Sequence, residues 1–283
     1  MPKNENTEKI EFNRRDFLIK SLAISGYALA VYPLAYSAIQ TDQDGIEVAD
    51  VKIPVGKIKI PAYQAFPKGN KVYPVLIICH EIFGVHEYIK DLCRRFAKLG
   101  FYTIAPYLYF RQGEVNNIKE IPDIISKVVS KVTNKQVNTD LDATIKFLKE
   151  SKKIDVNKMY ITGFCWGGKA TWLYAAHNSE LKAAIAWYGP LLTNEKTKDE
   201  FPVDIAEKLK VPVLGLYGGK DARILPEHVE KMNNELKKGK SNSKIIVYPD
   251  ADHGFFADYR PSYNQMASDE ALREMLKWIK DHS

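Results

Sequence analysis

The sequence predicts one α/β domain with a mostly parallel central sheet that is flanked by helices on both faces. The chain has 283 residues, and 45% of them are apolar, so it can bury one large core. Short apolar runs alternate with segments of helical periodicity from residue 75 onward. Strands that alternate with helices make right-handed crossovers, which place the strands parallel within a single sheet.

The predicted strands show two kinds of pattern. Residues 48–66 alternate between apolar and polar side chains and contain prolines, as antiparallel edge strands do. The later strands are short apolar runs, which is typical of buried parallel strands. These later strands are predicted at 75–79, 101–105, 158–162, 183–187, 211–217 and 244–248.

Helices are predicted where apolar residues recur with helical spacing. They span 89–99, 121–132, 141–148, 169–177 and 265–279. No internal repeat divides this series. We therefore predict one domain at 48–283, preceded by a polar linker at 39–47.

The first 38 residues differ from the rest of the chain. Arg14 and Arg15 precede an uncharged apolar run at 21–39 that contains Ala and Ser. This pattern is typical of a twin-arginine export signal, which we predict at 1–38. We therefore expect the twin-arginine export machinery as a partner and a periplasmic or extracytoplasmic location. The run is also long enough to span a bilayer, so an uncleaved leader would anchor the protein in the membrane.

Charge and cysteine content exclude several classes of function. The formal net charge of +6 is spread along the chain, which favours a solvated surface over nucleic-acid binding. His86 and Glu87 have no third ligand at suitable spacing, so we expect no metal and no other cofactor.

Cys79 and Cys93 lie in apolar strand and helix patterns, where buried inert thiols are usual. A disulfide between them is the alternative.

The segment 163–168, GFCWGG, is a cysteine version of the G-x-S-x-G nucleophile elbow. A predicted strand precedes it and a predicted helix follows it, which is the context that this motif requires. A buried structural thiol is the alternative for Cys165, but glycines on both sides would serve no packing purpose in an ordinary strand. We therefore predict Cys165 as a nucleophile.

A candidate acid and a candidate base follow Cys165 along the chain. Asp221 and His253 each come shortly after a predicted strand. The order nucleophile, acid, base is that of the α/β-hydrolase fold. A free thiol has a pKa of about 8.5, so an imidazole that takes its proton is the expected activator. Asp250 and Asp252 are rival acids, but they stand too near His253 in the chain to reach the far side of its ring easily.

Acyl transfer also needs backbone donors for the oxyanion. The amide of Trp166 directly follows the nucleophile, and the amide of Ile82 lies in the loop after an earlier central strand. We predict these two amides as the oxyanion hole.

Several motifs in this order resemble the dienelactone hydrolase family, from about Val48 to the C-terminus. They are HEIFG at 80–84, PYLY at 106–109 with Arg111, GFCWGG at 163–168, WYG at 187–189, GKD at 219–221, and HGF at 253–255 before Arg260. The resemblance implies a cysteine hydrolase of the α/β-hydrolase fold that opens carboxylated enol-lactones. It assigns Cys165, Asp221 and His253 to the triad.

The same resemblance implies roles for four more residues. Glu81 matches an acidic residue that holds the thiol in its resting form and moves aside when substrate arrives. Arg111 and Arg260 match basic residues that grip the substrate carboxylate, and Tyr188 matches an aromatic residue that lines the pocket. From the residues alone, an acid beside a thiol disfavours premature ionisation, and a guanidinium suits a carboxylate. The alternatives are that Glu81 caps the next helix and that the arginines are only solvated.

The leading hypothesis is therefore an ester or lactone hydrolase that forms an acyl-enzyme on Cys165. The second is a non-catalytic periplasmic protein that binds a small molecule in a retained hydrolase pocket. A thiol redox protein is the third, but the chain contains no C-x-x-C motif. The export leader departs from the better-known cytoplasmic family members, which leaves the natural substrate open.

Overall fold

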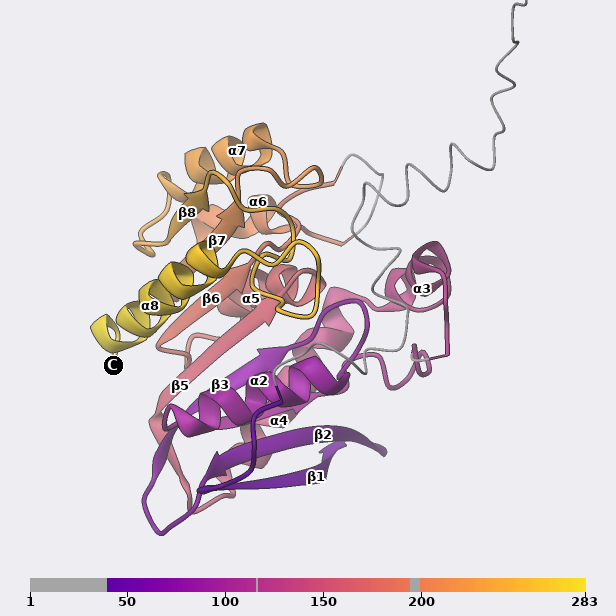
Figure 1. The fold of residues 1–283 in the computed structure, drawn as a ribbon, viewed down its shortest axis with the longest axis vertical. Helices are drawn as coiled ribbons and strands as arrows, with labels where there is room; N and C mark the ends of the chain where they lie inside the picture. The colour runs from indigo at the N-terminus through magenta and orange to yellow at the C-terminus, as the bar shows by residue number, and fades with distance from the viewer. Residues whose placement is uncertain (1–39, 116, 194–198) are drawn as a thin grey trace, which may run out of the picture.

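The computed structural model describes residues 40–115, 117–193 and 199–283, and the predicted export signal at 1–38 lies outside them. Within these ranges, one sheet is covered by helices on both faces (Figure 1). Its strands are β1 (Ile46–Val55), β2 (Ile58–Pro67), β3 (Tyr73–Cys79), β4 (Tyr102–Pro106), β5 (Ile154–Phe164), β6 (Ala183–Trp187), β7 (Val213–Gly218) and β8 (Lys244–Tyr248). The helices are α2 (Glu87–Lys98), α3 (Ile121–Lys127), α4 (Asn134–Lys149), α5 (Trp166–His177), α6 (Pro202–Ile205), α7 (Pro226–Leu236) and α8 (Gln265–Asp281), with 3-10 turns at Val129–Lys131 and Ala206–Lys208.

The strands follow the order β1-β2-β4-β3-β5-β6-β7-β8 across the sheet. The β1–β2 and β2–β4 pairs are antiparallel, whereas every pair from β4 to β8 is parallel. The predicted α/β-hydrolase fold with a mostly parallel sheet is thereby confirmed. The carboxyl ends of β3, β5, β7 and β8 meet at one edge of the sheet, which is where open α/β sheets bind their ligands.

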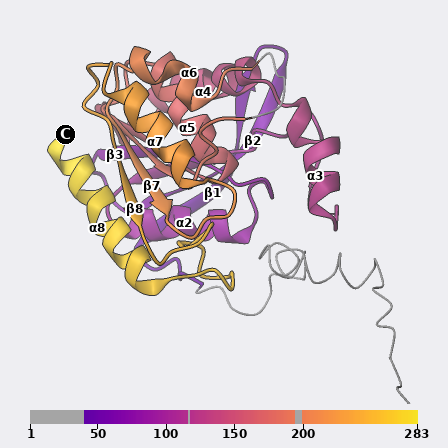
Figure 2. The ribbon, with the colours of Figure 1, turned by 90° about the horizontal axis from the view of Figure 1, so that it is seen from above.

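Two layers of helices enclose the sheet. α2 and α8 lie on one face, and α4, α5, α6 and α7 lie on the other (Figures 1 and 2). Ile77 in β3 and Ile161 in β5 are fully buried as a result. This double cover is why the central strands are continuous apolar runs in the sequence. None of the helices in the described ranges is long and apolar enough to cross a membrane.

Some elements differ in extent from their predictions. β1 begins at Ile46, two residues before the predicted domain boundary, because Ile46 is buried and pairs with Pro67. α4 begins well before the predicted residue 141, because the Thr133 hydroxyl caps it by accepting a hydrogen bond from the Gln136 amide at 3.2 Å. The helix predicted at 121–132 is divided into α3 and a 3-10 turn.

α7 is an addition to the predicted elements. Its buried side chains Val229, Met232 and Leu236 recur three and four residues apart, and Pro226 opens the helix. This is ordinary helical spacing, so the sequence contains the pattern that predicts α7.

Cys79 and Cys93 are buried free thiols, as the strand and helix patterns predicted. Burial raises the pKa of each to about 12, so both stay protonated and inert at neutral pH.

Candidate active site

Cys165 lies on the sharp turn between β5 and α5. Its backbone has φ 54° and ψ −118°, a conformation that residues with a side chain rarely adopt. This strained turn is the one that lifts the nucleophile of an α/β-hydrolase above its sheet. The strand and helix predicted around Cys165 are confirmed.

The glycines of the GFCWGG segment let α5 pack directly against the ends of the strands. A Cβ at Gly167 would lie 2.2 Å from the carbonyl oxygen of Cys79 in β3. A Cβ at Gly163 would lie 2.2 Å from the carbonyl oxygen of Gly167. Neither position has room for a side chain, so glycine at both is a packing requirement of the turn.

The predicted base and acid lie side by side. His253 Nδ1 is 2.7 Å from Asp221 Oδ2, and the Asp221 side chain is fully buried. Asp221 Oδ1 accepts hydrogen bonds from the backbone amides of Arg223 and Ile224 at 2.9 and 3.2 Å. With the carboxylate held in this way, the Nδ1–H of His253 donates a hydrogen bond to Asp221, and Nε2 is the ring atom for proton exchange with a nucleophile.

The surroundings of His253 favour its charged form. Burial lowers the pKa of His253, but the charge of Cys165 and the side-chain hydrogen bonds with Asp221 and Cys165 raise it, to about 9. At neutral pH a protonated ring therefore faces the sulfur. A protonated imidazole beside a cysteine is an arrangement that activates a cysteine nucleophile.

The two predicted oxyanion donors belong to neighbouring segments. Trp166 is the first residue of α5, so its N–H has no partner within the helix. Ile82 lies in the loop that follows β3. The close approach of Gly167 to the end of β3 brings these two segments together. Amides on two such segments can face one carbonyl oxygen.

Glu81 is fully buried and bound on both of its carboxylate oxygens. Arg260 Nη2 donates to Oε1 at 2.8 Å, the Tyr259 hydroxyl donates to Oε2 at 2.7 Å, and His86 Nε2 is 3.3 Å from Oε2. Burial raises the pKa of Glu81, but the charge of Arg260 and the hydrogen bonds with His86 and Tyr259 lower it, to about 2. The structure thus joins two predicted site residues, Glu81 and Arg260, in one buried ion pair. The role of Glu81 toward the thiol stays a prediction.

Arg111 is held by a carboxylate on α4. Its Nη1 and Nη2 donate to Oδ2 and Oδ1 of the buried Asp140 at 2.6 and 2.7 Å. Both arginines that were predicted to grip a substrate carboxylate therefore bind carboxylates of the protein itself. A substrate anion at Arg111 or Arg260 has to share the guanidinium with Asp140 or Glu81, or displace it.

Tyr188 follows β6 and packs against the His253 ring. It has φ 37° and is fully buried. The ring centroids of Tyr188 and His253 are 5.2 Å apart in an edge-on arrangement. The Tyr188 hydroxyl has no hydrogen-bond partner among the described residues. The role of Tyr188 in lining a substrate pocket stays a prediction.

The sequence profile of the dienelactone hydrolase family matches residues 60–283. The chain belongs to the dienelactone hydrolase family. A predicted carboxymethylenebutenolidase from Methylorubrum extorquens is 46% identical over 272 residues, which cover 95% of this chain and 93% of the relative. A predicted carboxymethylenebutenolidase from Escherichia coli is 48% identical over 261 residues, which cover 91% of this chain and 96% of the relative. The protein is therefore a hydrolase of this family.

Solved structures agree with this assignment. The crystal structure of a predicted dienelactone hydrolase from Klebsiella pneumoniae is 47% identical and superposes with a TM-score of 0.81, covering 84% of this chain and 99% of that one. The structure of a dienelactone hydrolase-like promiscuous phosphotriesterase from metagenomic libraries is 18% identical and has a TM-score of 0.70. The match covers 84% of this chain and 99% of that one. At that identity the second likeness shows the fold alone.

Three residues of this dienelactone hydrolase site are additions to the set predicted from the sequence. His86 and Tyr259 bind the Glu81 carboxylate, and His80 binds the Glu81 backbone carbonyl. His80 directly follows a buried strand, a place where functional side chains gather, so a pattern pointed to it. Tyr259 lies 178 residues from Glu81 along the chain, and no local pattern indicates such a contact.

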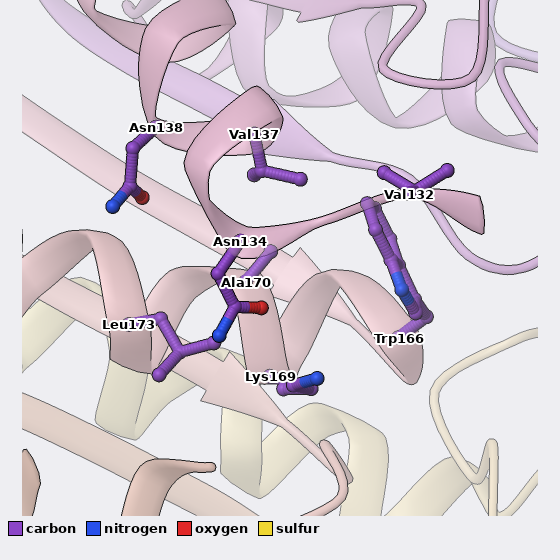
Figure 3. Close-up of a pocket in the computed structure, with 8 residues that line it drawn as sticks. All are labelled: Val132, Asn134, Val137, Asn138, Trp166, Lys169, Ala170 and Leu173. Carbon is purple, nitrogen blue, oxygen red and sulfur yellow. The ribbon is translucent and has the colours of Figure 1, made fainter. Parts of the chain in front are cut away.

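A small cleft lies between α4 and α5, next to the site. Figure 3 shows Trp166 and Val132 at one end of it, and Asn138 and Leu173 at the other. Its volume of about 10 Å³ has room for about one water molecule. The cleft is too small for a lactone. The Trp166 indole, which lines it, also stacks on the His80 ring with centroids 5.6 Å apart.

Proposed function

We propose that this protein hydrolyses esters or lactones through a Cys165 acyl-enzyme, with carboxylated enol-lactones as the expected substrate class. The observation that carries this proposal is the arrangement of the triad. Cys165 stands on a strained elbow, and His253 is hydrogen-bonded to the buried Asp221 at 2.7 Å. The same order of groups on this fold serves acyl transfer in α/β-hydrolases.

The proposed reaction has two steps. The Cys165 sulfur attacks the carbonyl carbon and forms a C–S bond, while the amides of Ile82 and Trp166 stabilise the oxyanion. The C–O bond of the ester or lactone then breaks, and the His253 imidazolium gives its proton to the departing oxygen. Neutral His253 next takes a proton from water, which attacks the thioester and releases the acid. The C–S bond then breaks, and the Cys165 sulfur and the protonated His253 return to their starting states.

The two arginines that bind carboxylates of the protein support a carboxylated substrate. A substrate carboxylate that binds Arg260 competes with Glu81, whose Oε1 accepts from the same guanidinium at 2.8 Å. Release of Glu81 on binding agrees with the role that the family resemblance implies for this residue. Arg111 is the less buried of the two arginines, since its side chain is 28% exposed against 4% for Arg260.

A panel of lactones and short esters, each with and without a second carboxylate, tests the proposal. Purified wild-type protein is expected to hydrolyse members of the panel, and the carboxylated lactones fastest. Cys165→Ala is expected to lower the rate by at least about 10³-fold, because the acyl-enzyme cannot form. Hydrolysis that survives in Cys165→Ala would refute the nucleophile, and equal rates with and without the carboxylate would refute the arginine sites. Saturable binding without product would instead favour the non-catalytic binding protein.

A further inference from the structure

His80 is a fully buried residue that follows β3 and makes two hydrogen bonds with the backbone. Its Nδ1 is 2.7 Å from the carbonyl oxygen of Glu81. Its Nε2 accepts a hydrogen bond from the backbone amide of Leu108 at 3.1 Å. The proposed reaction assigns this ring no proton transfer.

The partners of His80 determine its tautomer. The Leu108 amide is a donor, so Nε2 carries a lone pair, and the Glu81 carbonyl is an acceptor, so Nδ1 carries the proton. A second proton on Nε2 would point at the Leu108 N–H. Burial lowers the pKa of His80 to about 4, which agrees with a neutral ring at neutral pH.

The bond to Glu81 orients one of the proposed oxyanion donors. The carbonyl of Glu81 and the N–H of Ile82 belong to the same peptide unit, which is planar and trans. When His80 holds the carbonyl oxygen, the Ile82 N–H can point only in the opposite direction. The direction of that N–H is therefore set by the fully buried side chain of His80.

The same ring also contacts the residue that supplies the other donor. The rings of His80 and Trp166 stack with centroids 5.6 Å apart, and Tyr109 packs edge-on against both at 4.6 and 4.7 Å. Below them, Gly167 abuts the end of β3 so closely that a Cβ there would lie 2.6 Å from the His80 carbonyl oxygen. His80 thus lies between the two segments that form the proposed oxyanion hole.

We propose that His80 is a positioning residue for the oxyanion hole: its Nδ1–H holds the peptide unit between Glu81 and Ile82 so that the Ile82 amide faces the reacting carbonyl. This inference rests on the proposed attack by Cys165. It assigns a role to His80 that neither the triad nor the arginines supply.

Two amide substitutions separate the two hydrogen bonds of His80. The amide nitrogen of Asn lies near the place of Nδ1, so His80→Asn keeps a donor for the Glu81 carbonyl. The amide of Gln reaches the place of Nε2, so His80→Gln keeps the bond with Leu108 and loses the donor to Glu81. We expect His80→Gln to lower kcat by about 10- to 100-fold with little change in KM, less than the loss on deleting an oxyanion donor outright. His80→Asn is expected to retain at least about tenfold more of kcat than His80→Gln.

Two reactions of the Cys165 thiol distinguish positioning from a general structural effect. Alkylation by iodoacetamide displaces iodide from a saturated carbon and forms no oxyanion, so its rate is expected to be the same in wild type and His80→Gln. Addition to butyraldehyde forms a C–S bond and places the carbonyl oxygen in the oxyanion hole. Protection of Cys165 by butyraldehyde against iodoacetamide is therefore expected to weaken in His80→Gln in proportion to kcat, and to persist in His80→Asn.

Each result decides the inference. Equal kcat values and equal butyraldehyde protection in the Asn and Gln variants would overturn it, as would an alkylation rate that falls together with hydrolysis. If wild type hydrolyses no ester but butyraldehyde protection still differs between the variants, the proposed function fails and the role of His80 stands. If His80→Gln does not fold by circular dichroism, His80→Ala replaces it, because Ala also lacks the donor and adds no polar group.

Discussion

At the scale of single residues, the proposed reaction depends on the charge of His253. Its pKa of about 9 in the folded protein lies above the ordinary value of 6.5. A raised pKa means that the protonated ring stabilises the fold. This contribution is complete below pH 6.5 and is lost as the pH rises through 9. The same deprotonation removes the acid that protonates the leaving oxygen in the proposed reaction.

Asp221→Asn is expected to move the alkaline limb of activity to lower pH. The wild-type kcat/KM should fall above about pH 9, where His253 loses its proton. Beside Cys165, Asp221 is the second group that raises this pKa, so its replacement by Asn shifts the limb downward. The wrong ring tautomer also lowers kcat by up to about 10⁴-fold, as in serine triads. A pH–rate profile of both proteins measures the shift.

Asp252→Asn is the matched control for this prediction. Asp252 is exposed, and its Oδ1 accepts a hydrogen bond from the His253 backbone amide at 2.6 Å. Its substitution should leave the alkaline limb in place. An alkaline limb that shifts in Asp252→Asn and stays in place in Asp221→Asn would contradict the choice of Asp221 as the acid.

At the scale of elements, the site depends on how closely α5 approaches β3. The approach needs glycine at 163 and 167, since a Cβ at either position would lie 2.2 Å from a carbonyl oxygen. It places the Trp166 amide beside the loop that carries Ile82. The geometry of the proposed oxyanion hole is therefore a consequence of helix packing against a strand end.

Gly167→Ala is expected to abolish most hydrolysis, because the added methyl group pushes α5 away from β3. Overpacking of this kind costs about 1–3 kcal/mol of stability. Gly56→Ala, in the turn between β1 and β2, is the control, since Gly56 has φ +59° and nothing within 4 Å of an added Cβ. It should lose about 1 kcal/mol to backbone strain and keep its activity. Thermal melts and rates with one lactone test the pair, and wild-type kcat in Gly167→Ala would disprove the packing argument.

At the scale of the whole molecule, the parallel sheet gathers groups that are distant in sequence at one edge. The predicted nucleophile follows β5, the predicted acid follows β7 and the predicted base follows β8. Ahead of this domain lies the predicted export signal. We propose that the protein leaves the cytoplasm by the twin-arginine route and acts in the periplasm.

Replacing Arg14 and Arg15 by Lys together is expected to keep the full chain in the cytoplasm. The pair is the feature of the leader that the route requires, and Lys preserves its charge. Fractionation of a bacterial host that has this route, followed by immunoblotting, measures the distribution. Lys9→Arg is the control, and it should be exported like wild type. A periplasmic fraction unchanged by the double substitution would contradict the predicted signal.

The sequence by itself determined the fold class, the elbow turn and the order of the predicted nucleophile, acid and base, because these depend on local patterns. Apolar runs identify buried strands, glycines at 163 and 167 identify the elbow turn, and residues after parallel strands meet at one edge. α7 carries an ordinary helical pattern as well, with apolar residues at 229, 232 and 236.

Only the tertiary structure decided what the charged side chains bind. Arg260 pairs with Glu81 across 179 residues, and Arg111 pairs with Asp140 on a helix 29 residues away. His80 bonds to the loop after β4 and stacks on the first residue of α5. Such partners depend on which elements the sheet order and helix packing bring together, and no local pattern in the chain records that.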